Sequence, residues 1–120
     1  MGAKVLLVED DAATREAITE LLTRRGLEVL AADEGRKALE LMEAWRPEIV
    51  LLDVHMAGMG GVEFRANQKR KNRLARIPVV LMTGDPAPAV DADATLKKPF
   101  TPEELLAAVS RFVPALAVAT

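Results

Sequence analysis

Apolar residues in this chain fall into five short runs, separated by longer stretches in which apolar positions recur every three or four residues. The short runs predict buried strands, because both faces of most of them are apolar. The predicted strands are residues 4–8, 27–31, 48–52, 77–82 and 94–97. Continuous apolar strands that alternate with helices indicate a doubly wound parallel sheet, covered by helices on both faces.

Two helices are predicted in the first half of the chain. Residues 12–25 carry apolar side chains at helical spacing, and Gly26 occupies the position of a C-terminal cap. Asp33 is the predicted N-terminal cap of the next helix, which Pro47 ends. The apolar positions are Ala17, Ile18, Leu21 and Leu22 in the first helix, and Ala38, Leu39, Met42 and Trp45 on the inner face of the second.

Two further helices are predicted in the second half. A glycine-rich turn leads into a helix from about Val62, with Phe64 and Ala66 among its inward side chains. Thr101 is followed three residues later by Glu104, which is the spacing of a capping box at the start of a helix. The buried stripe of this last helix is predicted to be Leu105, Leu106, Val109, Phe112 and Val113.

Polar residues follow four of the five predicted strands. Glu9 and Asp10 follow the first strand, Asp53 the third, Thr83 the fourth and Lys98 the fifth. The second strand ends in alanines, as expected for an edge strand in the order 2-1-3-4-5. Ligands of such sheets bind at the carboxyl ends of the strands, so we expect the five residues to share one site. Singly, each has an ordinary explanation as a cap, strand or loop residue, and the prediction depends on their coincidence.

The chemistry of this predicted site is that of phosphoryl transfer. Crowded carboxylates repel one another unless a cation neutralises them, and oxygen ligands suit Mg²⁺. Lys98 and the metal would offset charge on the oxygens of a phosphoryl group, and Thr83 would hydrogen-bond one of them. Asp53 is then the predicted nucleophile, and its product is an acyl phosphate.

Length and composition limit the other classes of function. The 120 residues fit a single domain, residues 1–120, and half of them are apolar. The net charge of −2 points neither to nucleic acid nor to a membrane as a direct partner. With no cysteine, no signal-peptide pattern and no apolar run of membrane-spanning length, we expect a cytoplasmic protein. Six basic residues between positions 65 and 76 are interpreted as a solvated helix face, with an anionic partner as the alternative.

Four segments carry a resemblance to a known family: VLLVEDD with TREAI after it, PEIVLLDVHM with GMGG, PVVLMTG, and LKKPFTPEEL. Over almost its full length the chain resembles the receiver domain of two-component response regulators. The resemblance implies a flavodoxin-like (βα)₅ fold. It also implies that a histidine kinase or phosphotransfer protein supplies the phosphoryl group and that phosphorylation switches binding to a downstream effector. Such a domain is not an enzyme, because it assists only its own phosphorylation and dephosphorylation.

The resemblance assigns a role to each residue of the predicted site. Asp53 is the phosphoacceptor and a ligand of Mg²⁺, Asp10 also binds the metal directly, and Glu9 supports the metal without binding it. The main-chain carbonyl of His55 is the third protein ligand. Thr83 is the switch hydroxyl.

The resemblance also separates neighbouring residues of the same type. Lys98, directly before Pro99, contacts the phosphoryl group, whereas Lys97 lies outside the site, and the Lys98–Pro99 bond is cis. Asp11 serves helix entry rather than metal binding. The side chain of His55 is interpreted as a solvated loop residue, with an effect on the phosphoryl lifetime as the alternative.

The turn after Asp53 departs from the family pattern, with Ala57 and Gly60 in place of Pro and Asp, and two further features also depart from it. Thr95 takes the place of the switch aromatic, and only ten residues, 84–93, connect the fourth strand to the fifth. Ten helical residues span ~15 Å, less than the ~17 Å strand that this connection must retrace, and Pro86 and Pro88 obstruct a helix. We therefore expect the fourth helix to be missing or reduced, and the connection to be extended or irregular with fast amide exchange.

Other functions fit the sequence less well. A flavin-binding flavodoxin needs a phosphate loop after the first strand, where this chain has three carboxylates. A phosphatase with an aspartate nucleophile usually has a second acid two residues later, where this chain has His55. The remaining alternative is a pseudo-receiver, a binding module with little or no phosphorylation, which Thr95 and the short connection favour. The sequence leaves open whether the chain acts alone or within a longer protein.

Overall fold

The centre of the molecule is a five-stranded sheet in which every pair of neighbouring strands is parallel. The computed structural model describes residues 2–55, 58–85 and 90–114. The strand order is β2-β1-β3-β4-β5, which confirms the predicted order. The strands are β1 (Lys4–Val8), β2 (Glu28–Ala32), β3 (Ile49–Asp53), β4 (Val79–Thr83) and β5 (Ala94–Lys97).

Three strands begin one or two residues later than the apolar pattern predicts. Leu27 and Ile77 belong to the apolar runs and pack against the core, but the strands start at Glu28 and Val79. The apolar pattern of a sequence indicates which residues are buried, whereas a strand is defined by its hydrogen bonds. The predicted and observed bounds therefore differ at the ends of the elements. One consequence is that Asp53 is the last residue of its strand rather than the first residue after it.

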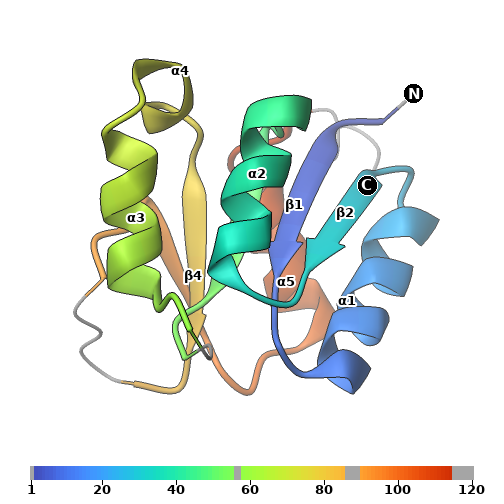
Figure 1. Cartoon of the computed structure of the whole chain (residues 1–120). Helices are drawn as coiled ribbons and strands as arrows, with labels where there is room; N and C mark the ends of the chain where they lie inside the picture. The colour runs from blue at the N-terminus through green and yellow to red at the C-terminus, as the bar shows by residue number, and fades with distance from the viewer. Residues whose placement is uncertain (1, 56–57, 86–89, 115–120) are drawn as a thin grey trace.

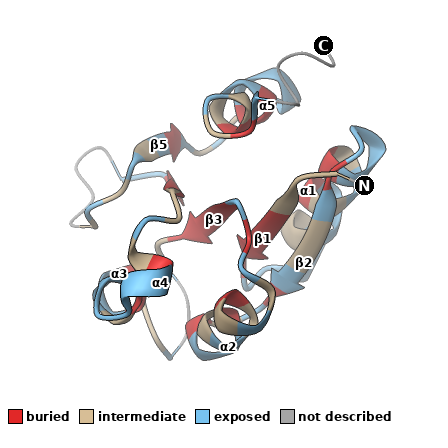
Figure 2. Ribbon diagram, turned by 90° about the horizontal axis from the view of Figure 1, so that it is seen from above, coloured by how far each residue is buried: buried red, intermediate tan, exposed pale blue. Residues whose placement is uncertain are grey.

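Helices cover both faces of the sheet, which makes the fold the predicted doubly wound one (Figure 1). Figure 2 shows α1 and α5 on one side of the sheet, and α2, α3 and α4 on the other. The helices are α1 (Ala12–Arg24), α2 (Gly35–Trp45), α3 (Gly61–Lys69), α4 (Asn72–Ala75) and α5 (Pro102–Ser110).

Each face of the sheet has its own apolar core. On one face, Ile18 and Leu22 of α1 and Leu105 of α5 pack against alternate residues of the strands. On the other, Met42 of α2 and Phe64 of α3 pack against the remaining strand residues. Every residue of β3 and β4 is buried, as expected for central strands covered on both faces.

The predicted end of α1 and the predicted start of α5 are confirmed, whereas α5 ends at Ser110, so that Phe112, partly buried, and Val113 lie beyond the helix whose stripe was predicted to include them. Gly26 follows α1 with φ of 86°, a left-handed conformation that glycine adopts without strain, and its N–H donates to the carbonyl of Thr23 at 3.0 Å. At α5, the Thr101 hydroxyl accepts from the N–H of Glu104 at 3.1 Å. The Glu104 carboxylate in turn accepts from the N–H of Thr101 at 2.8 Å, which completes the capping box.

The predicted cap of α2 is wrong. The N-cap residue is Glu34, and it makes no side-chain capping hydrogen bond. Asp33 instead forms an exposed ion pair with Lys37, at 3.2 Å between Oδ1 and Nζ. Both residues are acidic and adjacent, so the sequence alone did not separate them.

The inward face of α3 is only partly as predicted. Phe64 is fully buried, but Ala66 is exposed, and its predicted place in the core is taken by Arg65 and Gln68. Arg65 is only 8% exposed, so the interpretation of residues 65–76 as a solvated basic face fails at its first member. Three of the others are offset by acids: Lys69 pairs with Asp91, and Lys71 and Arg73 both pair with Glu43.

The connection between β4 and β5 is irregular wherever the structure describes it, at residues 84–85 and 90–93. Residues 86–89 lie outside the described residues. The expected reduction of this crossover is therefore confirmed, and the short helix α4 belongs to the preceding connection, between α3 and β4. The expected fast amide exchange stays a prediction.

The capping box gives a direct stability test. Thr101→Ala removes one side-chain hydrogen bond at the start of α5, and we expect the free energy of unfolding to fall by about 1 kcal/mol. Denaturant unfolding measures this difference, with Thr23→Ala, an exposed position inside α1, as the control. Equal stability of the two variants would show that the box contributes nothing.

Candidate functional site

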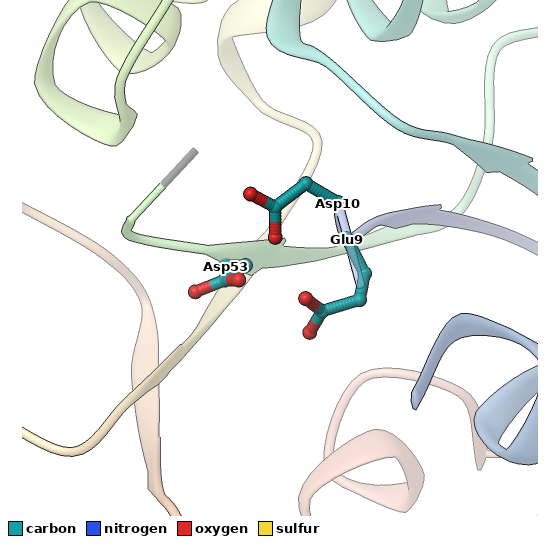
Figure 3. Close-up of side chains that lie close together, drawn as sticks. All are labelled: Glu9, Asp10 and Asp53. Carbon is teal, nitrogen blue, oxygen red and sulfur yellow. The ribbon is translucent and has the colours of Figure 1, made fainter. Parts of the chain in front are cut away.

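Three carboxylates meet at the carboxyl edge of the sheet. Glu9 follows β1 and Asp53 ends β3, and these strands are neighbours with Val8 opposite Leu52. Oxygen atoms of Glu9, Asp10 and Asp53 all lie within 4.8 Å of one another, and Figure 3 shows the three groups gathered around one space. Glu9 and Asp53 are 1% and 5% exposed, whereas Asp10 is open to solvent. The structure thus brings together the acids that the strand ends predicted.

Lys98 is the positive partner of this cluster. Its Nζ lies 3.1 Å from Glu9 Oε1 and 3.5 Å from Asp53 Oδ2. The backbone N–H of Lys98 donates to the carbonyl of Thr83 at 2.8 Å, and the following bond to Pro99 is cis, as expected. Lys97 belongs to β5 and is exposed, so the structure places Lys98, not Lys97, against the carboxylates.

Burial and crowding alter the titration of two of these groups. Burial raises the pKa of Glu9 to about 7, and the neighbouring Asp53 acts in the same direction, against hydrogen bonds from Lys98 and the Asp11 N–H. Burial alone would lower the pKa of Lys98, but its contacts with Glu9 and Asp53 outweigh this and raise it. The cluster therefore holds more negative charge than one lysine balances, which favours a bound cation.

The loops after β3 and β4 are tied to the site and to each other. The N–H of His55 donates to Asp53 Oδ1 at 3.2 Å, and the N–H of Asp85 donates to the Thr83 hydroxyl at 3.0 Å. Thr83 is 1% exposed and stands one residue beyond Met82, the register partner of Asp53. His55 Nε2 and Asp85 Oδ2 are 2.9 Å apart, so an exposed pair links the two loops.

Two residues at the site were missed by the sequence analysis. Asp85 was given no role by the sequence analysis, although Asp85 stands two residues after Thr83 just as His55 stands two residues after Asp53. Arg15 was also missed: its guanidinium donates to the carbonyl of Glu9 at 2.9 Å and to that of Asp10 at 3.4 Å. Arg15 thereby fixes the turn that presents the two acids, and its position one helical turn after Asp11 was the available signal.

Asp11 has the structural role that was expected of it. It is the N-cap of α1, and its carboxylate accepts from the N–H of Thr14 at 2.9 Å. The hydrogen bonds from the Thr14 hydroxyl and N–H lower the pKa of Asp11. Its N–H donates to Glu9 Oε2 at 3.2 Å, so the cap also anchors the buried glutamate.

The donor set fits a hard divalent cation. Carboxylate oxygens alone supply the cluster, and Mg²⁺ prefers oxygen ligands and commonly binds through one or two carboxylates while keeping several waters. Asp10 is solvent-exposed, which leaves room for such waters. A partly open cluster of this kind suits Mg²⁺, because a buried cage made only of protein ligands would leave no place for its waters.

Residues 5–110 match the family model of the response regulator receiver domain, and the chain therefore belongs to that family. It is 35% identical to the phosphate regulon transcriptional regulatory protein PhoB of Escherichia coli (strain K12), over 98% of this chain and 56% of that protein. It is 32% identical to the DNA-binding response regulator MtrA of Mycolicibacterium paratuberculosis, over 91% of this chain and 50% of that protein. The chain thus spans about half the length of the curated relatives it matches.

Solved structures give the same family and fold. The chemotaxis response regulator CheY4 of Vibrio cholerae superposes with a TM-score of 0.87 at 32% identity, over 94% of this chain and all of that one. The receiver domain of the sensor histidine kinase PA1611 from Pseudomonas aeruginosa PAO1 superposes with a TM-score of 0.89 at 22% identity, over 95% of this chain and 99% of that one. That structure holds a magnesium ion in its active-site cleft. No helix in the described part of the present chain is long and apolar enough to cross a membrane.

Metal binding can be tested without any reaction. Because a cation relieves the repulsion within the cluster, Mg²⁺ should raise the melting temperature, with a stabilisation of about 2.7 kcal/mol at 100 times the dissociation constant. Asp10→Ala should abolish most of this rise, as measured by thermal unfolding at several Mg²⁺ concentrations. Asp33→Ala, which removes an exposed carboxylate outside the cluster, is the control. Undiminished stabilisation of Asp10→Ala would remove Asp10 from the site.

Proposed function

We propose that this domain is a phosphoacceptor: Asp53 takes a phosphoryl group from the phosphohistidine of a histidine kinase or phosphotransfer protein. The observation that carries the proposal is the setting of Asp53, a buried carboxylate at a strand end with Lys98 Nζ 3.5 Å from Oδ2 and two further acids beside it. Lys98, together with a cation held by the acids, would place positive charge where a transferring phosphoryl group needs it.

The transfer is a displacement at phosphorus. A carboxylate oxygen of Asp53 forms the new O–P bond, the P–N bond to the partner's histidine breaks, and its electron pair stays on the imidazole nitrogen. Asp10, Asp53 and the carbonyl of His55 would hold Mg²⁺, which would neutralise charge on the phosphoryl oxygens. Lys98 supplies a second positive charge, and Glu9 keeps it in place through the 3.1 Å contact.

Thr83 is suited to detect the phosphoryl group. Its hydroxyl oxygen accepts from the N–H of Asp85, so its own hydrogen is available for donation to a phosphoryl oxygen. A hydrogen bond from that hydroxyl to a phosphoryl oxygen would reorient the hydroxyl, whose oxygen accepts from the N–H of Asp85 and so holds the loop there. Because Asp85 pairs with His55, the change reaches both loops at the mouth of the site.

The domain acts as a switch rather than as a turnover catalyst. Its relatives in the curated comparison include DNA-binding regulators that are about twice its length, so we infer that phosphorylation controls binding to an effector domain or protein. Direct contact with nucleic acid or membrane is not required of this domain, whose net charge is −2. We place the exchange in the cytoplasm, where the partner kinases present their histidines.

A pseudo-receiver is the second candidate, and two observations favour it. Thr95 is an exposed residue of β5 where the family pattern has an aromatic ring, and the β4–β5 connection carries no helix in its described residues. Either difference could weaken the response to phosphorylation. Neither removes a residue of the acceptor site, so phosphorylation itself separates the two candidates.

Mass spectrometry after incubation with a small phosphodonor and Mg²⁺ tests the acceptor. The wild-type chain should gain one phosphoryl group, and Asp53→Asn should gain none, because the amide cannot form the acyl phosphate. Asp91→Asn, at an exposed acid outside the cluster, should label like the wild type. Labelling of Asp53→Asn would show that another residue is the acceptor. An unlabelled wild type would favour the pseudo-receiver.

A further inference from the structure

The second half of the β4–β5 connection lies along α3, and Arg65 holds it there. The Arg65 guanidinium donates to the carbonyl of Asp91 at 2.8 Å, to Gln68 Oε1 at 2.7 Å and to Asp93 Oδ2 at 3.2 Å. A forked guanidinium presents several donors in a fixed plane, so Arg65 binds two residues of the crossover and one of α3 at once. Lys69 adds an ion pair with Asp91 one turn further along the helix.

The partners of Arg65 are themselves anchored. Asp93 Oδ2 accepts from the N–H of Val79 at 2.8 Å, and the N–H of Asp93 donates to the Val79 carbonyl at 2.9 Å, so residue 93 is fixed to the start of β4. The amide of Gln68 donates to the carbonyls of Leu74 and Ile77, both at 2.9 Å. Residues 90–93 therefore have one defined course against α3.

At the other end of this course, Val90 packs against the start of α3. A Cβ atom placed on Gly61 would lie 3.1 Å from Val90 Cγ2, 3.4 Å from Val54 Cγ2 and 3.5 Å from Val54 Cα. The backbone of Gly61 is not in the left-handed region, so a side chain here would be opposed by the tight contact with Val90 and not by the backbone conformation. Gly61 thus lets Val90 and Val54 approach the same point of the helix.

Val54 connects this contact to the acidic site. It directly follows Asp53, its carbonyl accepts from the N–H of Gly61 at 3.4 Å, and its N–H donates to the Met82 carbonyl at 3.3 Å. The next residue is His55, whose N–H bonds to Asp53 Oδ1. A groove of about 470 Å³ is lined jointly by Val54, His55, Gly61, Asp85 and Val90, with neighbouring residues of α3.

We infer that Gly61 and Val90 are positioning residues, which set the place of the loop after Asp53 from outside the site. With the crossover held by Arg65, Val90 packs at Gly61 on the start of α3, next to Val54, which directly follows the acceptor. The inference rests on the proposed function in one respect: the loop that is braced carries the His55 carbonyl, a proposed ligand of Mg²⁺. In this chain residues 90–93 of the short crossover thereby take part in forming the site.

A pair of small substitutions tests the inference in the full chain. Gly61→Ala adds one methyl group against Val90, so the loop should shift and Mg²⁺ should bind at least about threefold more weakly. Val90→Ala removes the methyl groups that Ala at position 61 would meet. The double variant should therefore bind Mg²⁺ about as tightly as Val90→Ala alone. Titration with Mg²⁺, followed by the backbone amide NMR signals of Val54 and His55, gives both the affinity and the loop position.

Gly60→Ala is the matched control, because a Cβ at Gly60 meets no atom within 4 Å and φ there is −78°. It should leave Mg²⁺ affinity and the amide signals of Val54 and His55 unchanged. Alanine otherwise favours a helix over glycine, so a loss in Gly61→Ala cannot come from helix propensity.

Two outcomes would overturn the inference. Independent, additive effects of the two substitutions would show that the residues do not act through their contact. A lower melting temperature of Gly61→Ala with unchanged Mg²⁺ affinity and unchanged Val54 and His55 signals would show a merely structural role. If the wild type binds no Mg²⁺, the proposed function fails, yet the metal-free amide signals of the same variants still decide whether the contact positions the loop.

Discussion

The repulsion among Glu9, Asp10 and Asp53 is the constraint around which the carboxyl edge of this domain is arranged. Since β1 and β3 are neighbouring parallel strands, acids at their ends face each other. A buried carboxylate without a partner is strongly unfavourable. Lys98, which directly follows the edge strand β5, provides that partner at the same carboxyl edge of the sheet. The Arg15 contacts with the β1–α1 turn and the Asp11 cap help to place the charges in this small volume.

Much of this arrangement could be predicted from the sequence because the parallel sheet converts sequence position into spatial position. A residue after a buried strand lies at one edge, whatever else the chain does, so five polar residues at four strand ends had to approach one another. The short β4–β5 connection was equally predictable, since the reach of ten residues depends on backbone geometry and not on side chains. The capping box of α5 is local, and Thr101 and Glu104 are enough to specify it.

What could not be predicted depends on pairs that are distant in the sequence. Arg65 is buried because Asp91 and Asp93, more than 25 residues later, bring it an acceptor and a charge, and no periodicity within α3 announces this. Ala66 was placed inward by the sequence analysis because alanine is more apolar than the neighbouring Arg65, whose acidic partners lie far along the chain. The cap of α2 was assigned to Asp33 instead of Glu34, and only the backbone of the preceding loop distinguishes them. His55 and Asp85 form a pair that appears once two loops from different strands are in place.

The polar character of β5 has a consequence for how this domain behaves among other copies of itself. Among the described residues β5 ends the sheet, with no strand on one side of its backbone, and it is only four residues long. Its outward side chains are Thr95, where the family pattern has an aromatic ring, and Lys97. Short edges that carry lysine resist pairing with a strand from another molecule, whereas an exposed aromatic edge invites it. With Thr95 in place of a ring and Lys97 beside it, this short edge is therefore protected against pairing with other copies of the domain.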